Sequence, residues 1–230
     1  MTAVDAAAVQ ERLARVRERI AGAAGGRPVE IVAVTKGFGP DAPRAALAAG
    51  LRLLGENYAQ ELVAKAAAVA EDPVPAAEPR WHFLGRLQRN KVRQLAPIVA
   101  VWESVDRIEL LDEIARRAPG AAVLVQANLS GEPQKGGAPL DDVPALVEHG
   151  AALGLEVRGL MGVGPAGDLA GTRRGFQALV ALADRLGLPE RSIGMSGDLE
   201  VAVEEGATLV RVGRDLFGPR PQRPSTGGRG

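Results

Sequence analysis

Cysteine is absent from these 230 residues, and aromatic residues make up only 3% of them. The missing thiols exclude disulfide bonds, thiolate zinc sites and cysteine nucleophiles. With so few rings, the 46% of residues that are hydrophobic must build a core mainly from Ala, Val, Leu and Ile. Net charge is also absent, since 28 Lys and Arg balance 28 Asp and Glu, so charge predicts neither nucleic acid nor an anionic membrane as a partner.

Long apolar runs are missing as well. Residues 1–10 lack a basic stretch followed by an apolar core and a cleavage site, and no later run is apolar enough to span a bilayer. We therefore expect a soluble, cytoplasmic protein. Its length lies within the range of one large α/β barrel.

Lysine is scarce, because Lys36, Lys65, Lys91 and Lys135 are the only lysines in a chain that otherwise uses arginine. Lys36 follows a short apolar segment, residues 31–34, that reads as a buried strand. A lysine kept at a strand end is a candidate for chemistry that arginine cannot perform, namely losing its proton and attacking a carbonyl to form a Schiff base. The alternative interpretation is a surface lysine just past a strand.

Short apolar segments alternate with segments of helical periodicity along the whole chain. Strands are expected at residues 31–34, 51–54, 81–84, 98–102, 121–128, 157–161, 192–195 and 209–212. Helices are expected at residues 5–21, 41–49, 58–70, 86–95, 106–117 (with Asp106 as N-cap), 140–153, 169–186 and 199–205. This order predicts the α/β class and a single (β/α)8 TIM-type barrel with an extra N-terminal helix.

One further feature supports a closed barrel rather than a nucleotide-binding open sheet. No Gly-x-Gly-x-x-Gly turn follows the first strand, which argues against a dinucleotide fold. The barrel is expected to occupy residues 1–218. Residues 219–230 have no apolar period, and we expect them to form a disordered tail.

In such a barrel, functional residues lie on the face where the strands end. Lys36 follows the first strand and Asn57 the second, while Ser196 follows the seventh and Gly213 and Arg214 follow the eighth. Loops after strands seven and eight often hold a phosphate, because glycine lets the backbone approach an anion and a serine hydroxyl adds a donor. An imine-forming lysine beside a phosphate site fits a phosphorylated aldehyde.

Two polar residues are expected inside or near the barrel. Arg211 lies in the last strand and points either into the barrel or toward the helices; if it is buried it needs a partner, and a pyridine nitrogen would be one. His82 alternates with Trp81 and Phe83, so we expect it on the opposite side of its strand from these large apolar residues. We favour a hydrogen-bonded structural role for it over a general base, because no carboxylate partner is identified.

Seven motifs, in order between residues 31 and 218, resemble the pyridoxal phosphate homeostasis protein family, the YggS/PROSC type. They are residues 31–36 (IVAVTK), 55–61 (GENYAQE), 81–91 (WHFLGRLQRNK), 126–136 (QANLSGEPQKG), 158–161 (RGLM), 194–200 (GMSGDLE) and 209–218 (LVRVGRDLFG). The resemblance implies a barrel similar to the N-terminal domain of alanine racemase, with pyridoxal 5'-phosphate (PLP) held as a Schiff base.

The resemblance also implies a role for each site residue. Lys36 would form the Schiff base, Arg211 would lie against the ring nitrogen, Ser196, Gly213 and Arg214 would contact the phosphate, and Asn57 would lie beside the cofactor. Many family members have a small hydroxyl residue at position 214, so Arg214 keeps the backbone donor but loses a hydroxyl contact.

The family is regarded as non-catalytic, serving to bind, buffer and deliver PLP within the pool of vitamin B6. Candidate partners are therefore PLP, other B6 vitamers and PLP-dependent apoenzymes, with no metal, nucleic acid or membrane, and we expect a monomer. A permanently charged Arg211 at the pyridine nitrogen would disfavour its protonation, which makes the ring a weaker electron sink and supports this interpretation.

Two enzymatic alternatives stay open. A PLP-dependent racemase acting on small amino acids would need a second base, and the only tyrosine, Tyr58, is expected to pack instead. A PLP-free Schiff-base aldolase would need an acid or base near Lys36, for which Glu56 and Glu103 are poor candidates.

Weaker hypotheses concern one further lysine and a run of basic residues. Lys135 is either a second, weaker PLP attachment point or, in our preferred interpretation, a loop charge. The run Arg86, Arg89, Lys91 and Arg93 reads as a solvated helix face, with attraction of phosphorylated vitamers or docking of acceptor enzymes as the alternative.

Overall fold

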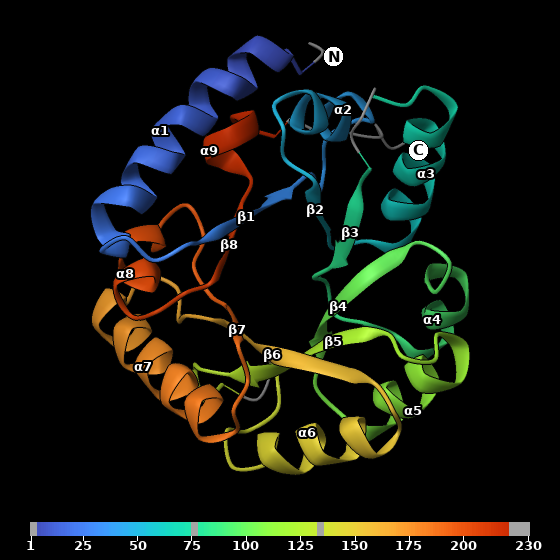
Figure 1. Cartoon of the computed structure of the whole chain (residues 1–230), viewed down its shortest axis with the longest axis vertical. Helices are drawn as coiled ribbons and strands as arrows, with labels where there is room; N and C mark the ends of the chain where they lie inside the picture. The colour runs from blue at the N-terminus through green and yellow to red at the C-terminus, as the bar shows by residue number, and fades with distance from the viewer. Residues whose placement is uncertain (1–3, 75–77, 133–135, 221–230) are drawn as a thin grey trace, which may run out of the picture.

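The computed structural model describes residues 4–74, 78–132 and 136–220, and Figure 1 shows how its strands and helices alternate. The strands are β1 (Glu30–Val34), β2 (Leu53–Glu56), β3 (Arg80–Phe83), β4 (Val99–Val105), β5 (Ala122–Asn128), β6 (Glu156–Val163), β7 (Glu190–Ser192) and β8 (Leu209–Val212). The helices in these residues are α1 (Ala6–Ala24), α2 (Asp41–Ala48), α3 (Ala59–Glu71), α4 (Arg89–Leu95), α5 (Ile108–Arg117), α6 (Val143–Ala152), α7 (Leu169–Arg185), α8 (Leu199–Glu204) and α9 (Arg214–Phe217).

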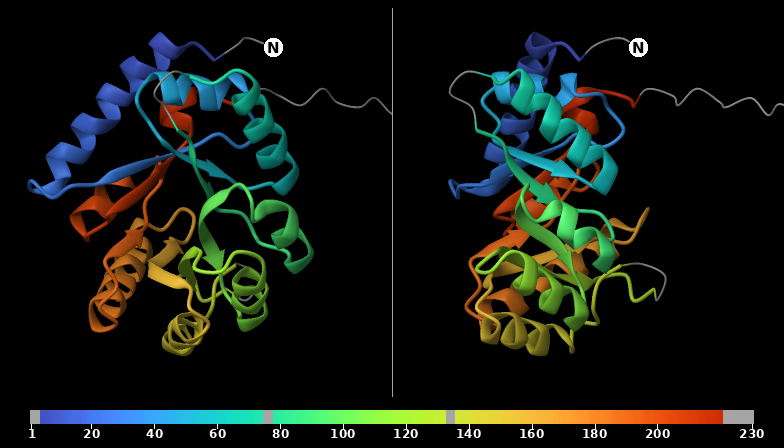
Figure 2. Two further views of the ribbon diagram at one scale, coloured as in Figure 1. Left: turned by 45° about the vertical axis from the view of Figure 1, so that its right-hand side comes forward. Right: turned by 90° about the vertical axis from the view of Figure 1, so that its right-hand side faces the viewer.

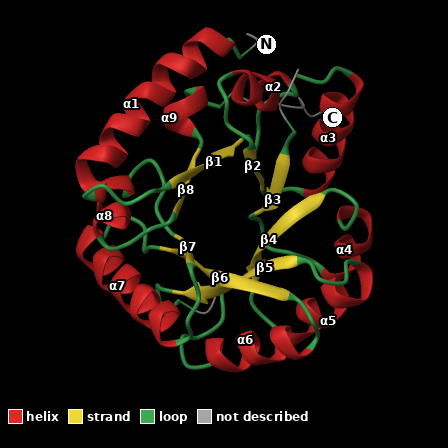
Figure 3. Cartoon of the chain, in the orientation of Figure 1, coloured by secondary structure: helices red, strands yellow, loops and turns green. Residues whose placement is uncertain are grey.

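The eight strands form one closed parallel barrel in which each strand pairs with its neighbours in sequence, and β1 pairs with β8. Figure 3 shows the strands as an inner ring and the helices as an outer ring, and the two other directions of Figure 2 show the helices around the same barrel. The predicted (β/α)8 barrel is therefore confirmed. Because all strands are parallel, their carboxyl ends meet on one face.

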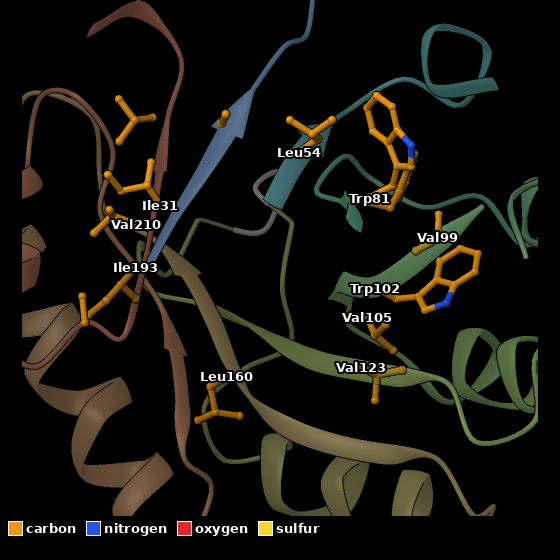
Figure 4. Packing of buried hydrophobic residues seen from close by; sticks show 14 of the residues in the cluster. Ile31, Leu54, Trp81, Val99, Trp102, Val105, Val123, Leu160, Ile193 and Val210 are labelled. Atoms are coloured by element: carbon orange, nitrogen blue, oxygen red, sulfur yellow. The ribbon is translucent and has the colours of Figure 1, made fainter. Parts of the chain in front are cut away.

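Alternation along each strand divides the core into two layers. Outward-facing residues such as Ile31, Trp81, Trp102 and Val210 join one large apolar cluster with the helices, and Figure 4 shows them around the barrel wall. Inward-facing apolar residues form two small clusters, which are Val32, Leu53 and Leu209, and Val101, Ala122, Leu124 and Met161. The interior therefore has room for polar side chains as well.

The predicted N-terminal helix is present as α1, three residues longer at its end than expected. Asp5 caps it by accepting hydrogen bonds from the backbone N–H groups of Ala7 and Ala8, and Gly25 ends it in the left-handed region at φ 56°. Its buried face includes Leu13, at 1% exposure, and it packs against α2, α8 and α9. In Figure 1 this helix lies along the outside of β1 and β8.

Most predicted element boundaries differ from the structure by up to three residues, as in β2, which covers Leu53–Glu56 rather than residues 51–54. β7 covers Glu190–Ser192 rather than residues 192–195, and α4 begins at Arg89 rather than at residue 86. The predicted N-cap Asp106 is wrong, because the N-cap of α5 is Arg107 and makes no side-chain cap bond. Asp106 instead accepts hydrogen bonds from Arg107 Nη1 and from the backbone N–H of Gly137, a partner 31 residues away that no local pattern reveals.

The predicted tail is described only in part. Pro219 and Arg220 are described, and the Arg220 side chain lies against Gly37, with its Cδ 3.1 Å from the position that a Cβ would take there. Residues 221–230 lie outside the described residues, so the predicted disorder stays a prediction. Within the described part of the chain, no helix is long and apolar enough to cross a membrane.

The packing of α1 yields a stability prediction. Leu13→Ala should lower the free energy of unfolding by about 2–5 kcal/mol, because it removes fully buried methyl groups and leaves a cavity between α1 and the barrel. Leu153→Ala is the matched control, since Leu153 is 38% exposed and its loss should cost less than about 0.5 kcal/mol. Denaturant unfolding measures both, and equal effects would mean that α1 does not stabilise the barrel.

Candidate functional site

A cavity of about 590 Å³ lies at the carboxyl ends of the strands. All six predicted site residues line it, from the segments after β1 and β2, the β7–α8 segment, β8 and the start of α9: Lys36, Asn57, Ser196, Arg211, Gly213 and Arg214. Arg220 lines it as well, although nothing in its local sequence distinguishes it from other arginines. The barrel thus brings into one cavity residues that lie up to 186 positions apart in the sequence, from Val34 to Arg220.

Lys36 is half-buried in the wall of this cavity. Burial lowers the pKa of its amine, the positive charges of Arg220 and Arg211 lower it further, and the charge of Glu56 opposes them. A lowered pKa increases the neutral fraction of the amine near neutral pH. Lys36 therefore has the character of a nucleophile that can attack a carbonyl.

A second lysine, Lys65, holds the residue before Lys36 in place. It is 4% exposed, and its Nζ donates to the Thr35 carbonyl oxygen at 2.7 Å and to Glu56 Oε1 at 2.5 Å. Glu56 Oε1 also accepts a hydrogen bond of 2.6 Å from Thr35 Oγ1. Sequence reasoning missed this role, because the scarcity of lysine singles Lys65 out but does not name its partners.

Glu61 holds the residue after Lys36. Its Oε2 accepts hydrogen bonds from the Gly37 backbone N–H at 2.8 Å and from Lys65 Nζ at 3.1 Å. Gly37 has a φ of 78°, a conformation that other residues rarely adopt, and Arg220 packs against it. The backbone on both sides of Lys36 is therefore fixed through one buried amine.

The Arg211 side chain points into the barrel, which settles the orientation that its sequence left open. It is 5% exposed, and Nη1 donates to the Ser192 carbonyl oxygen at 2.5 Å and to Ser192 Oγ at 2.8 Å, while Nη2 donates to the Gly162 carbonyl oxygen at 2.9 Å. Burial lowers its pKa, and the charges of Glu103 and Asp198 raise it again. These bonds fix the guanidinium at the floor of the cavity.

Glu103 continues this chain of hydrogen bonds across the interior. It lies in β4, not after it as predicted, and is fully buried. Ser192 Oγ donates to Glu103 Oε2 at 2.5 Å, and His82 Nδ1 lies 2.5 Å from Glu103 Oε1. Burial alone would raise the pKa of Glu103, but the hydrogen bond and charge of His82, with the charge of Arg211, hold it below its usual value.

His82 is therefore a hydrogen-bonded histidine on the side of β3 opposite Trp81 and Phe83, as the alternation predicts. The sequence did not identify a carboxylate partner for it, and the structure shows that Glu103 on the next strand is that partner. The register explains the miss, since His82 and Val101 are neighbours across β3 and β4 and only strand pairing brings Glu103 within reach.

Asn57 contributes a polar atom with no use elsewhere in the described structure. Its side-chain Oδ1 is buried and has no hydrogen-bond partner among the described residues, and the residue lines the cavity. Gly85 permits this arrangement, because a Cβ at that position would lie 1.9 Å from the Asn57 carbonyl oxygen. A buried polar atom without a partner is costly, so a ligand in the cavity that donates to it would gain affinity.

Positive charge dominates the cavity. Lys36, Arg211, Arg214 and Arg220 line it, and Asp198 is the only carboxylate among the described lining residues. Burial raises the pKa of Asp198, whose Oδ1 accepts a hydrogen bond of 2.6 Å from the Met195 backbone N–H. This excess of cations favours an anionic ligand.

Several other predicted residues lie away from the cavity. Tyr58 is 56% exposed, so its predicted packing role is wrong, and neither it nor Glu56 is among the cavity-lining residues. The basic run does not line the cavity either, and Arg89 lies 3.6 Å from Glu113, which agrees with a solvated helix face. Lys135 lies outside the described residues. Within the described residues, no group of His, Asp and Glu could hold a metal ion.

Known proteins resemble this chain over almost its whole length. The family model described as alanine racemase, N-terminal domain, matches residues 4–221. A pyridoxal phosphate homeostasis protein of Pseudomonas aeruginosa is 41% identical over 225 residues, covering 92% of this chain and 96% of that relative. One of Deinococcus radiodurans is 44% identical over 210 residues, covering 88% and 95%.

A solved structure agrees with these relatives. PipY of Synechococcus elongatus with PLP bound is 33% identical, with a TM-score of 0.75, and the match covers 91% of this chain and 100% of PipY. The chain therefore belongs to the pyridoxal phosphate homeostasis protein family, whose barrel is that of the alanine racemase N-terminal domain.

Proposed function

We propose that this chain binds PLP through a Schiff base with Lys36 and holds it for PLP homeostasis without turning over a substrate. The observation that carries this proposal is the cavity itself. It places an amine of lowered pKa, a buried guanidinium and two glycine-containing loops around one space of about 590 Å³. The PLP bound to PipY, and the names of the relatives, support the same cofactor for this chain.

The residues present fit PLP. The cofactor supplies an aldehyde that condenses with an amine and a phosphate that carries negative charge. The amine of Lys36 and the cation excess match these two groups, and the unpartnered Asn57 Oδ1 offers an acceptor for a donor on the ligand.

Each of the six predicted site residues then has one task. Lys36 forms the covalent attachment, while Arg211 presents its guanidinium to the pyridine nitrogen. The loop residues Ser196, Gly213 and Arg214 hold the phosphate with backbone N–H groups, a hydroxyl and a charge. Asn57 orients the ring from the β2 side.

Two features support holding rather than turnover. Arg211 is a donor only, so it favours an unprotonated ring nitrogen and a weak electron sink. Among the described lining residues Asp198 is the only candidate for a second base, and the exposed Tyr58 is not among them. A PLP-dependent racemase-like activity is the alternative that the assays below would reveal.

The aldolase alternative has less support. It needs a carboxylate or tyrosine at the Lys36 amine, but Glu56 is bonded to Thr35 and Lys65, and Glu103 is bonded to His82 and Ser192. We further propose that the protein acts as a cytoplasmic monomer whose barrel comprises residues 1–218, accepts other B6 vitamers and delivers PLP to apoenzymes.

The attachment point can be tested directly. Wild-type protein incubated with PLP should turn yellow and, after borohydride reduction, carry the cofactor on the peptide that contains Lys36. Lys36→Ala should lose the colour and bind PLP at least about tenfold more weakly, a loss of about 1.4 kcal/mol. Absorbance titration and peptide mass spectrometry measure both effects.

Lys91→Ala is the matched control, because Lys91 does not line the cavity and its loss should leave the colour unchanged. The loaded wild type should not racemise or decarboxylate small amino acids. A wild type that takes up no PLP would refute both the carrier and the racemase, and measurable turnover would favour the racemase.

The pH dependence of Lys36 gives a second test. In the apoprotein, the rate at which an amine reagent labels Lys36 should reach half its maximum below pH 10.5, the ordinary value for lysine. Arg220→Gln removes a positive charge that lowers this pKa, so the midpoint should move to higher pH by up to about one unit.

Arg86→Gln is the control for this test, since Arg86 is exposed and does not line the cavity. Labelling of the Lys36 peptide is followed by mass spectrometry over a pH series. A midpoint that stays in place or moves to lower pH in Arg220→Gln would rule out electrostatic coupling between these two residues.

A further inference from the structure

One buried carboxylate has no task in the binding scheme above. Glu103 is 0% exposed, lies in β4 and does not line the cavity. A buried carboxylate loses the stabilisation that water gives to its charge, so it needs hydrogen bonds and a partner of opposite charge. Both of its oxygens are used, one by Ser192 and one by His82.

His82 is a costly source of that opposite charge. Its Nδ1 faces Glu103, whereas its Nε2 is buried without a hydrogen-bond partner among the described residues. A protonated ring would carry an N–H at Nε2 with no acceptor, which is costly inside a protein. A charged His82 is therefore a costly partner for Glu103, so the carboxylate needs a second source of positive charge.

Arg211 supplies that positive charge. The guanidinium and the carboxylate are one hydroxyl apart, because Ser192 Oγ accepts from Arg211 Nη1 at 2.8 Å and donates to Glu103 Oε2 at 2.5 Å. The Ser192 hydroxyl has a single proton, which it donates to Glu103. The hydrogen bonds therefore run from Arg211 through Ser192 to Glu103. All three residues come from different strands and are buried together.

We propose that Glu103 is the positioning residue of the cofactor site, acting as the buried counter-ion that keeps Arg211 charged and pointed at the cavity. This inference rests on the proposed function, because the role of Glu103 depends on PLP binding in the cavity. A fixed, charged Arg211 is what would keep the pyridine nitrogen of PLP unprotonated. Glu103 itself touches neither the cavity nor Lys36 and acts only through Ser192 and Arg211.

The apoprotein offers a readout that needs no cofactor. The groups acting on the Lys36 amine are Arg220, Arg211 and Glu56, with Arg214 and Asp198 also lining the cavity. Glu103→Gln keeps the size of the side chain but removes the charge that offsets Arg211. The labelling midpoint of Lys36 should therefore move to lower pH by about half a unit.

Two variants make this result specific. Glu103→Asp keeps the negative charge, so its labelling midpoint should lie close to the wild-type value. Glu113→Gln removes a carboxylate of α5 that is only 6% exposed and is paired with Arg116 and Arg117, so it makes the same change in net charge away from the cavity and should leave the midpoint unchanged.

A merely structural role of Glu103 predicts that the labelling midpoint of Lys36 moves in the opposite direction. If Glu103→Gln only loosened the barrel, water would reach Lys36, the effect of burial would weaken, and the midpoint would rise toward pH 10.5. An unchanged or raised midpoint in Glu103→Gln would overturn the proposal. Failure of the wild type to take up PLP would instead refute the proposed function, and the two failures are therefore distinct.

A double variant keeps the proposal testable if Glu103→Gln does not fold. Glu103→Gln with Arg211→Gln removes both charges of the pair, so it should have a higher midpoint of thermal unfolding than Glu103→Gln alone. Circular dichroism on the two proteins measures this difference. A double variant that is no more stable than the single one would show that Arg211 and Glu103 are not a charge pair.

Discussion

Closure of an eight-stranded parallel sheet is the constraint on which the site depends. A closed barrel has a narrow interior, so inward-facing side chains from all eight strands lie within reach of one another. A charged group placed there must find its partners among the same few residues, because water is excluded. Arg211 on β8 does so through Ser192 on β7 and Glu103 on β4, which are distant in sequence and adjacent only because the sheet closes.

Two buried charge pairs, rather than the many surface ion pairs, determine where the functional groups lie. Breaking a buried pair costs about 3–5 kcal/mol, whereas an exposed pair contributes about 0–1 kcal/mol. Lys65 with Glu56 fixes the backbone beside Lys36, and Arg211 is held at the cavity floor by Ser192, which links it to Glu103 in the charge pair proposed above. Surface pairs such as Arg15 with Glu11 are solvated and place no residue of the site.

These two pairs have different consequences for chemistry. The pair beneath Lys36 fixes the backbone but leaves its amine free in a positively charged cavity, which favours the neutral, reactive form. The pair proposed beneath Arg211 keeps a permanent donor where the proposed function places a ring nitrogen. An amine ready to bond beside a donor that disfavours carbanion formation suits a protein that holds an aldehyde cofactor better than one that turns over a substrate.

The sequence by itself determined the barrel and the cavity residues, while the tertiary structure decided how those residues are held. Alternation of apolar and helical segments is a local pattern, and the ends of parallel strands share one face, so Lys36, Asn57 and Ser196 could be placed without coordinates. The direction of Arg211, the partner of His82 and the role of Lys65 could not. Each depends on a contact between strands or helices that only barrel closure and strand register bring together.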